Sequence, residues 1–185
     1  MKPEPGDQML SLVTEDLPAR EWHEENGVIY FTVTSGGADG KGWVESLRKK
    51  GFRIGGENVF LGSDFKPTNG VVYHVAVFKG DLFDEDTRIT KNIREEAEGR
   101  RFSDLHSEAA GLIREKFSDE DLEAMGLSGI IVMHKPVKDL SGIPIILAVI
   151  REAGGRLLDA CLGGPDVRWR KAYGFAFQKM TLQGA

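Results

Sequence analysis

Cysteine is almost absent from this sequence, in which Cys161 is the single thiol among 185 residues. One cysteine excludes an internal disulfide, and it also excludes a zinc site built from the cysteines of one chain. Cys161 follows an apolar segment and has no basic neighbour in sequence, so we expect a small core residue rather than a reactive thiol. We expect neither a cofactor nor a metal ion.

Long apolar runs are lacking as well. The longest, Ile143 to Ile150, contains Pro144 and is far shorter than the ~20 residues that cross a bilayer. Residues 1–8 are polar and do not resemble the apolar run of a secretion signal. These absences predict a soluble, cytoplasmic chain with no membrane partner.

Basic residues are outnumbered, with 24 Lys and Arg against 29 Asp and Glu, for a formal net charge of −5. This balance disfavours a general polyanion binder, although a local basic cluster can override it. The content of 41% hydrophobic and 29% charged residues is that of an ordinary globular protein. A polar, proline-containing start predicts a tail with a short helix over residues 1–26, followed by a single α+β domain over residues 27–185.

The first half of the domain reads as strands and helices in alternation. Residues 28–34, rich in β-branched and aromatic side chains, predict a strand. Asp39 is placed to cap a helix that Gly51 ends. Further strands are predicted over residues 52–61, 71–78 and 130–133. His74 lies within an otherwise apolar strand, so we expect it to be a hydrogen-bonded core residue.

Three helices are predicted between the strands at 71–78 and 130–133. Ile89, Ile93 and Ala97 recur at four-residue intervals, which is the spacing of one helix face. A second helix is expected to open at Ser103 and run to Phe117. The third begins after Ser118, which forms a capping box with Asp121, and it ends at Gly126.

The carboxyl-terminal part reads as strands joined by glycine turns. Residues 145–150 and 157–162 flank Gly154 and Gly155, which favours a hairpin, with a helix through Glu152 as the alternative. A last strand is expected over residues 169–177, with its aromatic side chains on one face. Together the elements predict a two-layer α+β sandwich with a mostly antiparallel sheet. We expect a ferredoxin-like βαββαβ core followed by a C-terminal β-meander.

Two sequence motifs each lack a residue that their chemistry requires. The loop Ser35 to Gly42 follows a strand and precedes a helix, as a phosphate-binding Walker loop does, but Gly42 stands where the magnesium-binding hydroxyl residue is needed. The segment beginning His23-Glu24 is similar to the HExxH zinc signature, but Gly27 replaces the second histidine. Neither motif therefore predicts its activity.

Residues 171–177, Lys-Ala-Tyr-Gly-Phe-Ala-Phe, resemble the RNP1 strand of RNA-recognition domains, in which aromatic rings stack on bases. Ala172 and Gln178 depart from that pattern. Cations beside aromatic rings are nevertheless typical of single-strand binding. The candidate nucleic-acid-binding residues are Arg168, Trp169, Arg170, Lys171 and Tyr173.

A loop after the strand at 130–133 carries the candidate catalytic residues. His134 could act as a general base near neutral pH, Asp139 could orient its ring, and Lys138 could bind an anion. Strand ends often carry such groups. No nucleophile or oxyanion-binding element is evident beside them.

Taken together, the sequence favours a non-catalytic binding or interaction domain, because each enzymatic motif lacks a required residue. Its ligand or protein partner is not identified, and the sequence leaves homo-oligomerisation open. One alternative is nucleic-acid binding through the basic and aromatic residues at 168–173. The other is a small hydrolase or transferase centred on His134 and Asp139.

Overall fold

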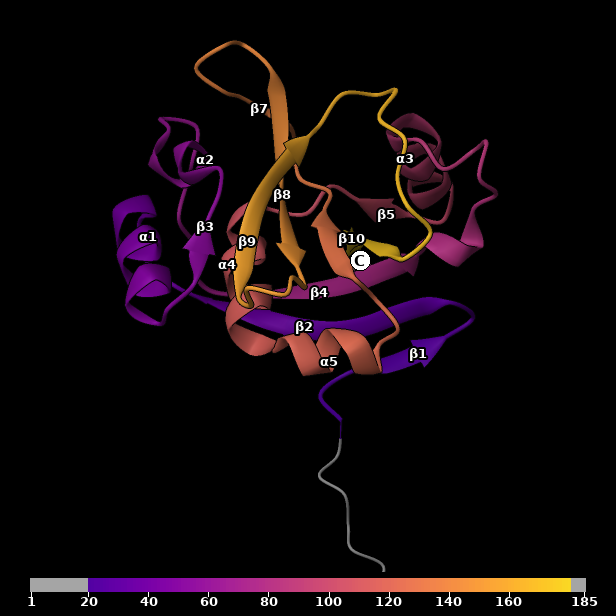
Figure 1. Ribbon diagram of the computed structural model, residues 1–185, viewed down its shortest axis with the longest axis horizontal. Coiled ribbons are helices and arrows are strands. Elements are labelled where there is room, and N and C mark those ends of the chain that lie inside the picture. The colour runs from indigo at the N-terminus through magenta and orange to yellow at the C-terminus, as the bar shows by residue number, and fades with distance from the viewer. Residues whose placement is uncertain (1–19, 181–185) are drawn as a thin grey trace, which may run out of the picture.

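Ten strands form one mixed sheet in the computed structural model, which describes residues 20–180 (Figure 1). Along the sheet the order is β1 (His23–Glu25), β2 (Val28–Gly36), β4 (Asn69–Lys79), β10 (Tyr173–Lys179), β6 (Gly129–Val132), β8 (Pro144–Ile150), β9 (Leu157–Leu162) and β3 (Arg53–Ile54). Two short strands lie off this path, β5 (Phe102–Ser103) beside β10 and β7 (Val137–Lys138) beside β8. Most neighbours are antiparallel, and β6 with β10 and β3 with β9 are the parallel pairs.

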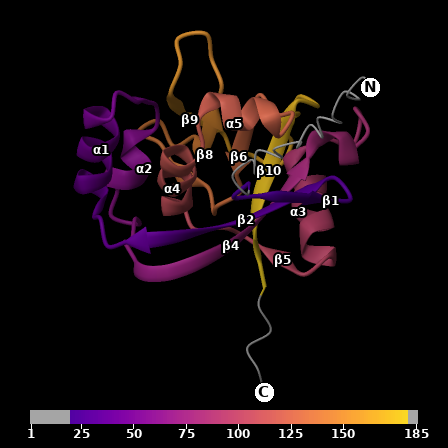
Figure 2. The ribbon, with the colours of Figure 1, turned by 90° about the horizontal axis from the view of Figure 1, so that it is seen from below.

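Helices cover both faces of this sheet. One face packs against α1 (Gly40–Lys49), α2 (Glu57–Leu61), α4 (Glu108–Lys116) and α5 (Asp119–Ala124). The other face packs against α3 (Thr90–Gly99), whose Ile93 and Ala97 contact a second apolar core. Figures 1 and 2 show α1 and α3 at opposite ends of the molecule, and Figure 1 shows β8 and β9 running across β2 and β4 in a strongly twisted sheet. The α+β class is confirmed, but the two-layer arrangement is not.

The ferredoxin-like core is not confirmed either. The strand predicted over residues 52–61 is reduced to β3, which pairs with β9 at the far end of the sheet, and residues 57–61 form α2 instead. β10 lies between β4 and β6, whereas a C-terminal meander would place it beside β9. Within that predicted meander the β8–β9 hairpin is present, with Ile150 opposite Leu157, so the helical alternative through Glu152 is wrong.

Local signals in the sequence were mostly sufficient to place helix ends. Asp39 caps α1, where its Oδ1 accepts the backbone N–H of Gly42 at 2.7 Å. Ser118 and Asp121 form the predicted capping box of α5. The second helix begins at Glu108 rather than Ser103, because Ser103 pairs with β10 in β5.

The amino-terminal helix is replaced by a strand within the described residues. β1 forms a hairpin with β2 through Asn26 and Gly27, both at positive φ, so the segment similar to HExxH lies on a hairpin. Residues 1–19 of the predicted tail and helix lie outside the described residues. Within residues 20–180 no helix is long and apolar enough to cross a membrane.

Candidate functional site

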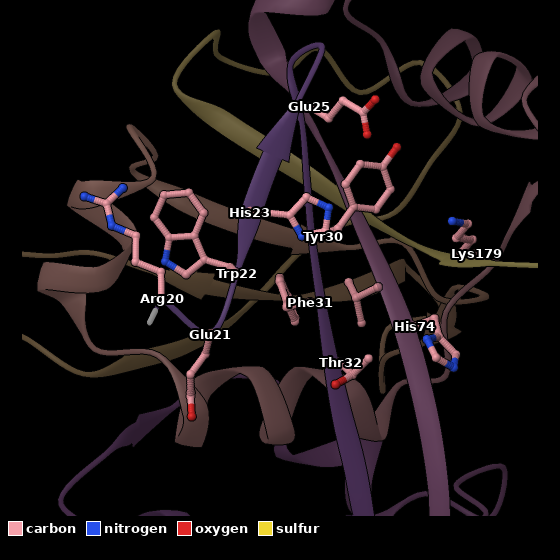
Figure 3. A pocket seen from close by; sticks show the side chains of 11 residues that line it. Arg20, Glu21, Trp22, His23, Glu25, Tyr30, Phe31, Thr32, His74 and Lys179 are labelled. Carbon is pink, nitrogen blue, oxygen red and sulfur yellow. The ribbon is translucent and has the colours of Figure 1, made fainter. Parts of the chain in front are cut away.

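A groove of about 470 Å³ opens where β1, β2, β4 and β10 come together (Figure 3). Its chemical character comes from aromatic and cationic side chains supplied by the segment before β1 and by all four strands. They are Arg20, Trp22, His23, Tyr30, His74 and Lys179. Its volume lies within the range of small-molecule sites.

Strand register places these side chains side by side. Tyr30 is opposite His23 on β1 and opposite Ala76 on β4, and the next pair along the ladder is Thr32 with His74. Directly opposed residues point to the same face of a sheet. Further along that face Phe78 is covered by the core around α3, but His74 is exposed to solvent. The prediction that His74 is a core residue is therefore wrong, because α3 covers only part of this face.

Aromatic rings in the groove are already arranged for stacking. The rings of His23 and Tyr30 lie 5.3 Å apart between centroids and are inclined by 23°. Lys179 Nζ lies 5.7 Å from the centre of the Tyr30 ring. The Arg20 guanidinium lies 5.1 Å from the centre of the Trp22 ring. Such cation–ring contacts are favourable and keep the charged heads at the groove.

Two cations, Arg20 and Lys179, and two carboxylates, Glu21 and Glu25, line the groove. Glu21 pairs with Lys116 of α4 at 3.0 Å, whereas Arg20 and Lys179 form no ion pair with any described residue. Burial raises the pKa of Tyr30, and the nearby Glu25 raises it further. The Tyr30 hydroxyl therefore remains a hydrogen-bond donor at neutral pH. The groove can hold a planar ring beside a negatively charged group.

The three candidate catalytic residues do not converge in the structure. His134 is buried, its Nδ1 lies 2.7 Å from the Lys135 carbonyl oxygen, and its Nε2 accepts the backbone N–H of Leu147 at 2.9 Å. Asp139 Oδ1 accepts backbone N–H groups of its own loop, those of Ser141 and Ile143. Lys138 lies exposed on β7. Asp139 is thus used to shape a turn and does not orient the imidazole.

The candidate nucleic-acid cluster is divided between the core and the surface. Trp169 is 8% exposed, and its Nε1 donates to Thr90 Oγ1 at 2.9 Å. It shares its core with Tyr173, whose ring meets it edge-on. Arg168 donates to the Glu85 carbonyl oxygen at 2.8 Å. Because Trp169 is enclosed, it offers no free face on which a base could stack.

The cations of that cluster differ in their surroundings. Lys171 Nζ lies 3.6 Å from an Asp81 carboxylate oxygen, and Arg168 faces Asp86 at 3.8 Å. Arg170 is exposed. These acidic neighbours reduce the positive potential that a nucleic-acid backbone requires.

A buried polar network was missed by the sequence interpretation. Glu108, 1% exposed, accepts hydrogen bonds from the Thr68 backbone N–H at 3.2 Å and from the hydroxyls of Thr68 and Tyr73. Burial and the bond to Glu108 raise the pKa of Tyr73 to about 12. Thr68 and Tyr73 are 40 and 35 positions from Glu108 in the sequence, so sequence spacing did not predict the network. The one available signal is a glutamate on the apolar face of a helix.

The described residues contain no group of three or more His, Cys, Asp or Glu side chains that could hold a metal ion. No protein-family model, curated protein or solved structure matches the chain. The geometry of the molecule itself is therefore the guide to its function.

Proposed function

We propose that this chain is a non-catalytic binding domain, and that the groove between β1, β2, β4 and β10 binds a small ligand with a planar ring and a negatively charged group. One observation carries the proposal. Tyr30 and Trp22 line the same groove as Lys179 and Arg20, and neither cation is neutralised by a described carboxylate. A planar ligand ring can add to the existing stack of His23 and Tyr30, and cations without an ion-pair partner attract anions.

The same groove lacks the arrangement that catalysis needs. His23 and His74 are its two imidazoles, and His23 is engaged in stacking with Tyr30. Neither imidazole is hydrogen-bonded to a hydroxyl group of the described residues, so no base is paired with a nucleophile. This supports binding without turnover.

Adenosine 5′-monophosphate is a suitable probe, because its parts can be tested separately. Adenosine carries the ring alone and inorganic phosphate carries the charge alone. We expect the monophosphate to shift the ¹⁵N–¹H resonance of the Trp22 indole more strongly than either part does. Tyr30→Ala should weaken binding about tenfold, the equivalent of ~1.4 kcal/mol from a lost stacking contact.

Lys179→Met and Lys41→Met form a matched pair of variants for the charge. Lys179 lies at the groove, whereas Lys41 is exposed on α1 and has no ion pair among the described residues. Lys179→Met should weaken binding of the monophosphate without affecting binding of adenosine. Lys41→Met should leave the binding of both compounds unchanged. Equal losses in the two variants, or resonance shifts confined to residues outside the groove, would contradict the proposal.

A further inference from the structure

A second cavity, of about 420 Å³, lies at the loop that follows β6. Two imidazoles, His106 and His134, and two lysines, Lys66 and Lys135, are among the residues that line it. Its walls come from three separate parts of the chain: the segment after α2, the segment just before α4 and the loop after β6. It is separate from the groove, with which it shares no residue.

The two imidazoles of the cavity are in different bonding states. Both ring nitrogens of His134 are occupied by backbone groups, so this side chain has nothing left to offer a ligand. His106 has one bond, in which its Nδ1 accepts the backbone N–H of Glu108 at 3.0 Å. Its Nε2 has no hydrogen-bond partner among residues 20–180, and the side chain is 29% exposed. His106 is therefore the imidazole available to a ligand.

The hydrogen bond at Nδ1 also determines whether His106 offers a ligand a hydrogen-bond donor or an acceptor. A neutral imidazole carries one hydrogen, and a nitrogen that accepts a hydrogen bond cannot be the one that bears it. Nε2 of His106 therefore carries the hydrogen and acts as a donor. A ligand that meets it must supply an acceptor.

Other groups at the cavity favour an acceptor that is also negatively charged. Lys135 forms no ion pair with a described residue. Lys66 Nζ donates a hydrogen bond to the Ser63 carbonyl oxygen at 3.0 Å. Because that carbonyl group is neutral, the bond does not neutralise the charge of Lys66. Ser107 adds a hydroxyl to the lining, and Asp64 is the carboxylate among the lining residues. Among the lining side chains, two ammonium groups therefore accompany one carboxylate. The Glu108 carboxylate lies 3.8 Å from His106 Nδ1, but it is buried and accepts hydrogen bonds from Thr68 and Tyr73.

We infer that this cavity is an oxyanion-binding site, in which His106 Nε2, Lys66 and Lys135 hold a phosphate or carboxylate group. The buried network behind His106 keeps its ring in place. Glu108 is fixed by Thr68 and Tyr73, and it supplies the backbone N–H that bonds Nδ1. Oriented donors bind anions better than mobile ones because less freedom is lost on binding.

Inorganic phosphate is the probe, titrated against the ¹⁵N-labelled full chain at constant ionic strength, with acetate and chloride as separate arms. Phosphate or acetate should shift the backbone resonances of residues 105–107 and 135–137, and chloride should not. The anion that binds more tightly, phosphate or acetate, identifies the group that the site prefers. Lys66→Met with Lys135→Met should weaken binding about tenfold, the result of losing two charge-assisted contacts that are partly exposed.

Lys138→Met is the matched control. Lys138 is three residues after Lys135 but does not line the cavity, so the same change in net charge there should leave binding unaltered. An equal loss in Lys138→Met would show that only the overall charge matters, and it would overturn the inference. Absence of shifts in residues 105–107 with both phosphate and acetate would also overturn it.

Variants at position 106 distinguish a role of His106 as a hydrogen-bond donor from a role in packing alone. His106→Gln places an amide N–H near the position of Nε2 and should retain most of the affinity for phosphate. His106→Leu should lower that affinity about tenfold. Thermal unfolding of both variants reports whether the fold is intact. If leucine binds phosphate as well as glutamine does, His106 is not a donor and the inference fails.

Discussion

His134 Nε2 accepts the backbone N–H of Leu147 at 2.9 Å, and this bond ties the loop after β6 to the middle of β8. The other ring nitrogen lies 2.7 Å from the carbonyl oxygen of Lys135. A side chain that is 1% exposed and bonded at both nitrogens is a structural cross-link. The same relationship explains why it cannot serve as a general base.

We predict that His134 makes the protein less stable in acid. Burial, with a smaller contribution from the positive charge of Arg94, lowers the pKa of His134 to about 4. In the unfolded chain its pKa is near 6.5, so between about pH 6.5 and 4 the unfolded state binds more protons. The stabilising contribution is complete above pH 6.5 and falls as the pH drops towards 4, by on the order of 3 kcal/mol.

Urea unfolding at a series of pH values measures this effect. His134→Leu should flatten the pH dependence over that interval, although it also lowers stability at pH 7 by leaving the Leu147 N–H without its partner. His23→Gln, at an exposed position, serves as the control and should leave the wild-type pH profile nearly intact. An NMR titration that placed the His134 pKa near 6.5 would contradict the prediction.

Trp169 should behave as a core residue. Trp169→Ala is expected to lower the free energy of unfolding by about 3–5 kcal/mol, because it leaves a cavity beside Phe175 and Thr90. Arg170→Ala, at the next and exposed position, should change it by less than ~0.5 kcal/mol. Chemical denaturation compares the two. A stable Trp169→Ala variant that lost affinity for single-stranded DNA would restore the nucleic-acid interpretation.

Gly36, at the end of β2, and Gly40, at the start of α1, should differ sharply in their tolerance of alanine. A Cβ at Gly40 would lie 1.8 Å from the Phe60 carbonyl oxygen, whereas at Gly36 it would meet nothing within 4 Å. We expect Gly40→Ala to cost about 1–3 kcal/mol or more through overpacking and Gly36→Ala to be nearly neutral. Thermal unfolding of both variants tests whether Gly40 is required for the packing of α1 on α2.

Cys161 should react slowly with alkylating reagents. Burial raises the pKa of its thiol to about 11, and the charge of Asp159 contributes to the increase. Because only the thiolate reacts, alkylation of the folded protein by iodoacetamide at pH 8 should be roughly a hundredfold slower than that of the unfolded chain. Equal rates in the presence and absence of urea would show that the thiol is neither buried nor suppressed.

Much of the local structure could be predicted from the sequence, because it depends on neighbouring residues. The caps at Asp39 and Ser118, the buried positions of Ile93 and Ala97 and the hairpin after Ile150 all follow from side chains within a few positions of one another. A capping hydroxyl or carboxylate bonds to a backbone N–H two or three residues away whatever the rest of the chain does. Tertiary packing therefore leaves these local hydrogen bonds unchanged.

Both candidate sites, in contrast, were decided by tertiary structure. The groove joins residues 20–32 with His74 because β2 pairs with β4, and with Lys179 because β10 inserts beside β4; no sequence spacing encodes this arrangement. His106 and His134 look alike in the sequence, yet within residues 20–180 Nε2 of His106 has no hydrogen-bond partner, whereas both ring nitrogens of His134 are bonded. The sequence by itself determined the caps of α1 and α5, the turn between β8 and β9, and which side chains are apolar. The strand order and the partner of each polar group came from long-range packing, since burial is a property of the whole molecule.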